Sequence, residues 1–186
     1  MRARVDVWEL QRELMAASGQ AMPERATLGA VAVLYLALLT EELSETLVVA
    51  ARVVIPPGRV RGEVLTIGLC FTHAAAVLHS VALEIRRNLG EMAADGRPFP
   101  DIALTMEQAK ELLDGTTDIA VVNAGFALAA GLPGPEGYLE VAGSNLSKRN
   151  PDTGVIDKDA SGKWIKGRDY VAPNLEAVLH RAGSVE

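Results

Sequence analysis

The sequence predicts an all-α protein, built as a four- to five-helix bundle with a small C-terminal hairpin arm. Three observations predict this fold class. Apolar residues recur at helical spacing along most of the chain, proline and glycine fall mainly between these stretches, and turn signals that join short strands gather near the C-terminus. With 186 residues, of which 49% are apolar and 23% charged, the chain suits a single domain over residues 1–186.

Capping and breaking residues set the expected boundaries of each element. Pro56 and Pro57 end a long apolar stretch, because proline cannot continue a helix. Thr105 and Gln108 have the spacing of a capping box at the start of another helix. The predicted helices are residues 5–17, 24–54, 62–94, 105–131, 136–147 and 175–180, and the predicted hairpin arm is residues 148–173.

The third predicted helix contains a stretch without charge. Residues 64–83 carry no formal charge over nearly the length that spans a bilayer. Polar side chains, among them Thr66, Thr72, His73 and His79, are spread along the stretch rather than gathered at its ends. We therefore expect no membrane partner, and a helix buried inside a bundle or at a subunit interface.

Composition narrows the other partners. The formal net charge of -6 gives no general attraction to nucleic acid, so we expect no nucleic-acid partner. The single cysteine, Cys70, provides neither a disulfide nor a zinc site of four cysteines. This cysteine usage favours a cytoplasmic location, and charged residues interrupt the first stretch where an export signal would be apolar.

Two acidic clusters lie within otherwise apolar stretches. They are Glu41, Glu42 and Glu45 in the second predicted helix, and Glu111, Asp114 and Asp118 in the fourth. Residues three or four apart share one face of a helix, so each cluster stacks like charges. Such stacking destabilises a helix unless a bound cation reverses the sign of the interaction.

Carboxylate oxygens without histidine or thiolate ligands favour Mg²⁺, or alternatively Mn²⁺. A solvated helix face is the ordinary explanation of an acidic cluster. Leucines such as Leu39 and Leu43 crowd the second predicted helix and leave it little solvent face. The clusters therefore indicate a metal centre, and with it an enzyme acting on a phosphorylated substrate.

The same residues resemble a known family, the all-α nucleoside triphosphate pyrophosphohydrolases. This MazG-like superfamily also contains phosphoribosyl-ATP pyrophosphohydrolase and dimeric dUTPases. Its pattern is E-E-x-x-E on one helix, matched at residues 41–45, and an acidic pair ending in aspartate on a later helix, matched at Asp114 and Asp118. Gly115 stands where the family usually has glutamate. Residues 13–20, 125–133, 140–148 and 150–179 are similar to family segments, whereas residues 53–100 are not.

The resemblance implies a chemistry and a role for each residue. Glu42, Glu45, Asp114 and Asp118 would hold Mg²⁺, and Glu41 would orient or deprotonate the attacking water. The substrate would be an NTP or dNTP, hydrolysed between its α- and β-phosphates to the monophosphate and pyrophosphate.

Further residues are suited to bind the substrate. Asn145 and Lys148, three apart on one helix face, could donate to a base or ribose and to a phosphate. The predicted arm carries three further basic residues, Lys163, Lys166 and Arg168. They would either close over the phosphates of the substrate or only keep the exposed arm solvated.

A second hypothesis is a non-catalytic relative that uses the same bundle for nucleotide binding or assembly, which Gly115 and the unfamiliar residues 53–100 would favour. Under either hypothesis we expect a homodimer or homotetramer, because the arm and the charge-free helix suggest that neighbouring subunits complete the pocket. No motif specifies the base or the sugar.

Overall fold

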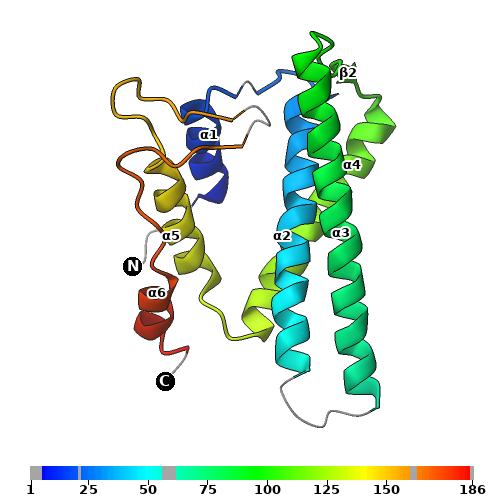
Figure 1. The fold of residues 1–186 in the computed structure, drawn as a ribbon, viewed down its shortest axis with the longest axis vertical. Coiled ribbons are helices and arrows are strands. Elements are labelled where there is room, and N and C mark those ends of the chain that lie inside the picture. The colour runs from blue at the N-terminus through cyan, green and yellow to red at the C-terminus, as the bar shows by residue number, and fades with distance from the viewer. Residues whose placement is uncertain (1–5, 21, 56–61, 160–162, 185–186) are drawn as a thin grey trace. The chain divides into compact units, whose positions relative to one another are not determined.

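The computed structural model describes residues 6–20, 22–55, 62–159 and 163–184. The predicted all-α fold class is confirmed, with one pair of two-residue strands as the sole sheet within these residues (Figure 1). The chain divides into two compact units, Thr27–Ala103 and the remainder. The elements are α1 (Val7–Ala17), β1 (Thr27–Leu28), α2 (Ala30–Val54), α3 (Glu63–Ala94), β2 (Ile102–Ala103), α4 (Met106–Ala129), α5 (Gly134–Leu146) and α6 (Leu175–Ala182).

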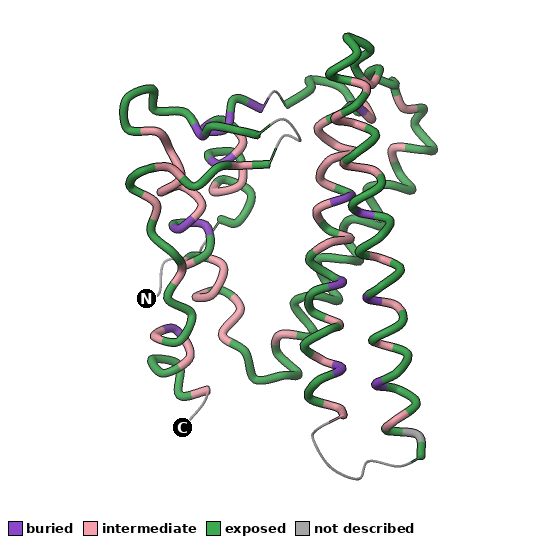
Figure 2. Tube along the Cα trace, viewed as in Figure 1, coloured by how far each residue is buried: buried purple, intermediate pink, exposed green. Residues whose placement is uncertain are grey.

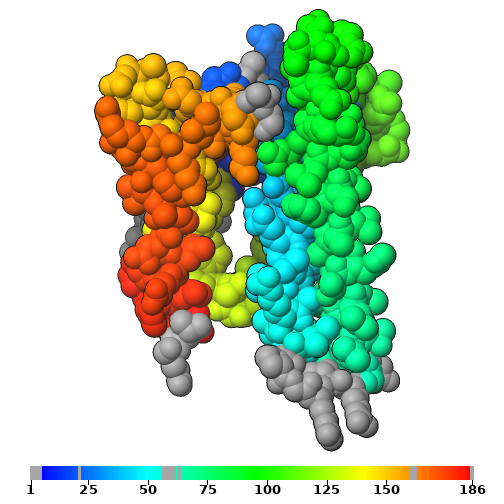
Figure 3. Space-filling view, in the orientation of Figure 1, coloured from blue at the N-terminus to red at the C-terminus, as the bar shows by residue number. Residues whose placement is uncertain are grey.

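The unit Thr27–Ala103 is an antiparallel hairpin of α2 and α3, in which α3 is the longer helix and lies beside α2 (Figures 1 and 3). The buried positions of its two helices carry small residues that recur every seven residues, as in a coiled coil. Figure 2 shows them as short buried patches spaced along both helices. They are Ala37, Ser44 and Ala51 on α2, and Gly68, Ala75 and Ala82 on α3. Small side chains at the contact allow two helix axes to approach closely.

Gly68 shows how close this approach is. A Cβ atom at this position would overlap the side chain of Ile55, which follows the last turn of α2. The absence of a side chain therefore lets Ile55 pack directly on the backbone of α3. The predicted break at Pro56 and Pro57 lies outside the described residues.

The outer faces of this hairpin are apolar and exposed, which corrects one prediction. The charge-free stretch of α3 was expected to be buried, but apart from Gly68, Ala75 and Ala82 its side chains are exposed or half-buried. The reason is that the contact with α2 needs one narrow face of α3, and within one chain the described residues cover little of the rest. By length and composition alone, α3 from Val64 and α4 could each cross a membrane.

The start of α2 was also predicted wrongly. The helix begins at Ala30 rather than Glu24, because Thr27 and Leu28 pair with Ala103 and Ile102 in an antiparallel ladder. Gly29 separates β1 from α2 and has extended backbone angles. The carboxylate of Asp101 occupies the space that a Cβ atom of Gly29 would need, so a larger residue at this position would have to displace the Asp101 side chain.

The other unit is organised around α5, which packs against α1 and α6. Tyr138 of α5 donates a hydrogen bond from its hydroxyl to the carbonyl oxygen of Val7 in α1 (3.1 Å). Partial burial raises the pKa of this Tyr138 phenol. The predicted boundaries of α1, α5 and α6 agree with the structure within two residues, apart from Val5, which lies outside the described residues.

The helix α4 differs from its neighbours in having no buried residue. Its predicted capping box is confirmed: Thr105 Oγ1 accepts from the Gln108 backbone, and Gln108 Oε1 accepts from the Thr105 backbone (3.3 and 3.0 Å). Large apolar side chains, among them Leu113, Val122 and Leu128, are more than two-thirds exposed. The cap fixes where α4 begins, but packing within the described chain does not cover it.

The predicted hairpin arm consists of two isolated antiparallel bridges, Arg149 with Ile156 and Lys158 with Trp164, rather than regular strands. Its turn at Ser161 and Gly162 lies outside the described residues. Ile156, 2% exposed, anchors the arm, because its backbone N–H donates to the carbonyl of Ala17 at the end of α1 (2.8 Å).

We predict that Ala75→Leu destabilises the protein whereas Ala76→Leu does not. Ala75 lies in the close contact between α2 and α3, and its exposed neighbour Ala76 lies outside it. Overpacking such a contact typically costs about 1–3 kcal/mol. Chemical denaturation followed by circular dichroism measures both variants. Equal stabilities would show that the seven-residue pattern of small residues does not govern the packing.

Candidate active site

The first acidic cluster occupies the middle of α2, and its members face different surroundings. Glu41 points toward α3, where its Oε2 accepts a hydrogen bond and ion pair from Arg86 Nη1 at 2.6 Å. The two side chains are only 13% and 11% exposed. Glu42 and Glu45 lie on the exposed part of the same helix. One carboxylate is therefore fixed inside the hairpin, while two are accessible.

The second acidic cluster lies on α4, where Glu111, Asp114 and Asp118 are all exposed. Together with Glu107, Lys110 and neighbouring side chains, Glu111 and Asp114 line an open hollow of about 450 Å³ along this helix. Glu107 is neutralised by Lys110 at 3.0 Å. Asp114 and Asp118, one turn apart, present accessible carboxylates.

The predicted metal ligands divide equally between the two units. Glu42 and Glu45 belong to one, and Asp114 and Asp118 to the other. Within the described residues, no three Asp, Glu, His or Cys side chains lie where they could hold one metal ion. The donor chemistry nevertheless suits Mg²⁺, since all four groups are accessible carboxylates. The assignment of these four residues as ligands stays a prediction.

The structure does bring the predicted substrate-binding residues together. Lys148, at the end of α5, donates from Nζ to Asn145 Oδ1 at 2.7 Å. The same Nζ lies 5.7 Å from the ring centroid of Trp164 and 6.0 Å from that of Tyr170. Lys166 Nζ lies 4.9 Å from the Tyr170 ring. We call Asn145, Lys148, Trp164, Lys166 and Tyr170 the basic-aromatic cluster.

Aromatic rings attract ammonium groups without neutralising them, so the ring of Tyr170 leaves the positive charge of Lys166 in place. Among the described residues no carboxylate forms an ion pair with Lys166. Arg168, another candidate, lies 3.7 Å from carboxylate oxygens of both Asp152 and Asp169, while Lys163 is exposed. The cluster therefore contains two lysines beside aromatic rings, whereas Arg168 is partly compensated by two carboxylates.

Backbone contacts hold the arm against α5 at this cluster. A Cβ atom on Gly167 would lie 3.1 Å from the carbonyl oxygen of Lys148, tighter than van der Waals contact. The Ser147 hydroxyl accepts from the Val171 backbone at 2.8 Å, and the Ser144 hydroxyl donates to the Val171 carbonyl at 2.7 Å. Glycine at position 167 thus permits the approach that places Lys166 near Lys148.

Two residues of these sites were missed from the sequence. Arg86 belongs to the segment without family resemblance, and nothing in its spacing relates it to Glu41. Tyr170 lies in a segment without helical or strand periodicity. Its sole signal is its place four residues after Lys166, which by itself does not show that the two side chains meet.

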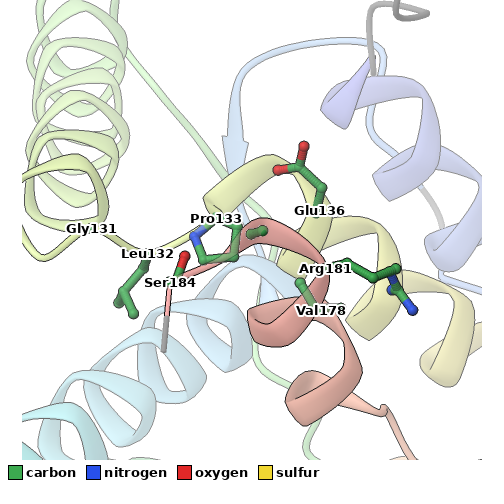
Figure 4. A pocket seen from close by; sticks show the side chains of 8 residues that line it. Gly131, Leu132, Pro133, Glu136, Val178, Arg181 and Ser184 are labelled. Carbon is green, nitrogen blue, oxygen red and sulfur yellow. The ribbon is translucent and has the colours of Figure 1, made fainter. Parts of the chain in front are cut away.

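A separate hollow of about 610 Å³ lies beside the turn between α4 and α5 and along α6 (Figure 4). Glu136 and Arg181 are its charged lining residues, and their side chains point in different directions (Figure 4). None of the predicted site residues lines this hollow. It therefore supplies no chemistry that the acidic clusters or the basic-aromatic cluster could use.

Comparison with known proteins identifies the fold. No family model matches the chain, and no curated protein matches it. A crystal structure from Exiguobacterium sp. 255-15, described as a "putative NTP pyrophosphohydrolase", matches with a TM-score of 0.61 at 20% sequence identity. The match covers 98% of this chain and 98% of that chain. The two proteins therefore share a fold over 98% of each chain, so the likeness extends beyond the segments that the sequence motifs covered.

Proposed function

We propose that the protein is a metal-dependent nucleoside triphosphate pyrophosphohydrolase, which hydrolyses an NTP or dNTP between the α- and β-phosphates. The full-length match to the fold of the Exiguobacterium protein carries the proposal. That match rests on backbone shape, whereas the family resemblance rests on the motifs around Glu41 and Asp118. Two independent observations therefore support the same activity.

Each residue has a role in the proposed reaction. Water attacks the α-phosphorus, the bond from this phosphorus to the bridging oxygen breaks, and pyrophosphate leaves with that oxygen. Glu41 orients the water and accepts its proton. Glu42, Glu45, Asp114 and Asp118 would hold Mg²⁺, which when bound would supply positive charge to the phosphate oxygens and acidify water.

The basic-aromatic cluster would bind the negatively charged substrate. Lys148 and Lys166 supply charge-assisted hydrogen bonds to phosphate oxygens. Asn145 already holds Lys148 through its side-chain oxygen, and its amide N–H groups remain suited to donate to a base or ribose. The rings of Trp164 and Tyr170 restrict where the two ammonium groups lie.

We predict that the protein releases pyrophosphate from at least one nucleotide in a panel of NTPs, dNTPs and dUTP, and that chelator abolishes the release. Asp118→Asn and Glu45→Gln should lower kcat/KM by about 100-fold or more, because each removes a charged ligand. Glu107→Gln, on the same helix as Asp118 and paired with Lys110, should leave activity unchanged.

Two results would contradict this proposal in different ways. Hydrolysis that persists in chelator would exclude the metal-dependent reaction. No release from any nucleotide by a protein folded according to circular dichroism would favour the non-catalytic relative that binds nucleotides or assembles.

We predict that Lys148→Met and Lys166→Met each raise KM about tenfold or more, with a smaller effect on kcat. A charge-assisted hydrogen bond contributes about 1.5–3 kcal/mol, which corresponds to this range. Lys158→Met is the matched control, because Lys158 is an exposed lysine of the same arm outside the cluster. Steady-state kinetics at several ionic strengths measure the effect, and an equal rise in KM for Lys158→Met would remove the cluster from substrate binding.

We also propose that the protein is cytoplasmic and forms a homodimer or homotetramer. Monomeric soluble proteins rarely leave a large contiguous apolar surface uncovered. In this chain α4 has no buried residue, and α3 exposes apolar side chains such as Ile67, Val77 and Leu83. A membrane is a poorer cover for α4, since Asp114 and Asp118 would be costly in hydrocarbon. A second copy of the chain buries such faces without that cost.

We predict that light scattering coupled to size-exclusion chromatography gives at least twice the mass of one chain, without detergent. Val122→Asp should reduce the mass toward that of one chain, because it places a charge on an apolar face of α4 where Val122 is 69% exposed. Val155→Asp, an equivalent change on the exposed arm, is the control. A wild-type monomer, or extraction only with detergent, would contradict the proposal.

A further inference from the structure

The ion pair between Arg86 and Glu41 differs from other ion pairs of the protein in its surroundings. Arg12 with Glu9 and Arg87 with Glu84 are pairs within one helix, and all four side chains are more than half exposed. The pair between Arg86 and Glu41 instead joins two helices, with both side chains almost enclosed.

The packing of the hairpin explains why this pair is enclosed. Ala37 and Ala82 have no exposed surface, and Ser44 is 2% exposed, so the backbones of α2 and α3 are close on either side of Glu41. The Ser44 hydroxyl also donates to the carbonyl oxygen of Glu41 at 2.6 Å. Both the backbone and the carboxylate of Glu41 are therefore restrained.

A purely structural role does not account for this pair well. The cost of removing two charges from water offsets much of their attraction, and apolar residues of similar volume often stabilise a contact equally well. Most of the surrounding contact consists of alanine, with Ser44 beside Glu41, so an apolar pair of residues would also fit there. The acidic residue that pairs with Arg86 is also the first residue of the motif Glu41-Glu42-Leu43-Ser44-Glu45.

We propose that Arg86 is a positioning residue that fixes the carboxylate of Glu41 for its reaction with water. This inference rests on the proposed function. Arg86 Nη1 donates a hydrogen bond to Oε2 of Glu41 and so sets the plane of the carboxylate. The other carboxylate oxygen, Oε1, is the one that accepts a hydrogen bond and then the proton from the attacking water.

The consequence for catalysis is geometric. A misplacement of a catalytic group by about 1 Å can cost about 100-fold in rate. Without Arg86, the Glu41 side chain would sample several rotamers on α2, whereas Glu42 and Glu45 would keep their positions on the exposed face. Loss of Arg86 should therefore lower kcat while the KM for nucleotide and the Mg²⁺ dependence stay close to wild type.

A double-mutant cycle tests this inference with Arg86→Met, Glu41→Gln and the double variant. Arg87→Met is the matched control, because Arg87 is the next residue of α3 but pairs with Glu84 on the exposed side. We expect kcat to fall about 100-fold in Arg86→Met and at least as far in Glu41→Gln. The double variant should be no slower than Glu41→Gln alone, because Arg86 acts through Glu41. Arg86→Lys should restore part of the rate.

Thermal unfolding of each variant separates positioning from structure. A merely structural Arg86 would lower the unfolding midpoint and leave kcat per folded molecule unchanged, which overturns the inference. Effects that multiply in the double variant, or an equal loss in Arg87→Met, overturn it as well. If Arg86→Met does not fold, Arg86→Lys decides the question. A wild-type kcat in Arg86→Lys overturns the inference, and a reduced kcat at unchanged KM supports it. If the wild type hydrolyses no nucleotide of the panel, the proposed function fails and the role of Arg86 fails with it.

Discussion

The close contact between α2 and α3 is the constraint on which the rest of the hairpin depends. A side chain larger than alanine or serine at any of six heptad positions would separate the two backbones. Their proximity is what encloses Glu41 and Arg86 and lets Ile55 pack on Gly68. It also limits the contact to one narrow face of each helix, so the broad apolar faces of α2 and α3 remain for other partners. One feature of the sequence thus produces both an enclosed charge pair and an exposed apolar surface.

Charged side chains are arranged differently in the two units. In the hairpin, Glu41 is compensated within the chain by Arg86, while Glu42 and Glu45 are accessible. On α4 the carboxylates Asp114 and Asp118 stack on one exposed face, which is unfavourable for an empty helix. The basic-aromatic cluster, by contrast, gathers two lysines around tyrosine and tryptophan rings. Under the proposed function, the acidic residues would attract the metal ion and the two lysines would attract the phosphates.

Helix positions could be predicted from local signals, and the tertiary features could not. Proline, glycine and the capping box at Thr105 are read within a few residues, so most boundaries agree with the structure. The prediction of where α2 begins was wrong because Thr27 and Leu28 pair with residues far along the chain, and this pairing outweighs their helical propensity. The prediction that α3 is buried was wrong because the sequence shows which residues are apolar, but not whether the rest of the same chain covers them. The contact between Asn145 and Lys148 follows from helix spacing, whereas the contacts of Arg86 and Tyr170 are encoded by no local pattern.

The pairing of β1 with β2 has a consequence for the construction of the whole chain. Thr27 lies opposite Ala103, so the hairpin unit begins and ends at adjacent points, and the hydrogen bond from Leu104 N–H to the Ala26 carbonyl (3.1 Å) extends the ladder by one step. A segment whose ends meet can be lengthened, shortened or exchanged without displacing the residues before and after it. The two paired strands therefore form a junction at which this unit could be exchanged for another. Heptads could be added to or removed from α2 and α3 together while the junction stays unchanged.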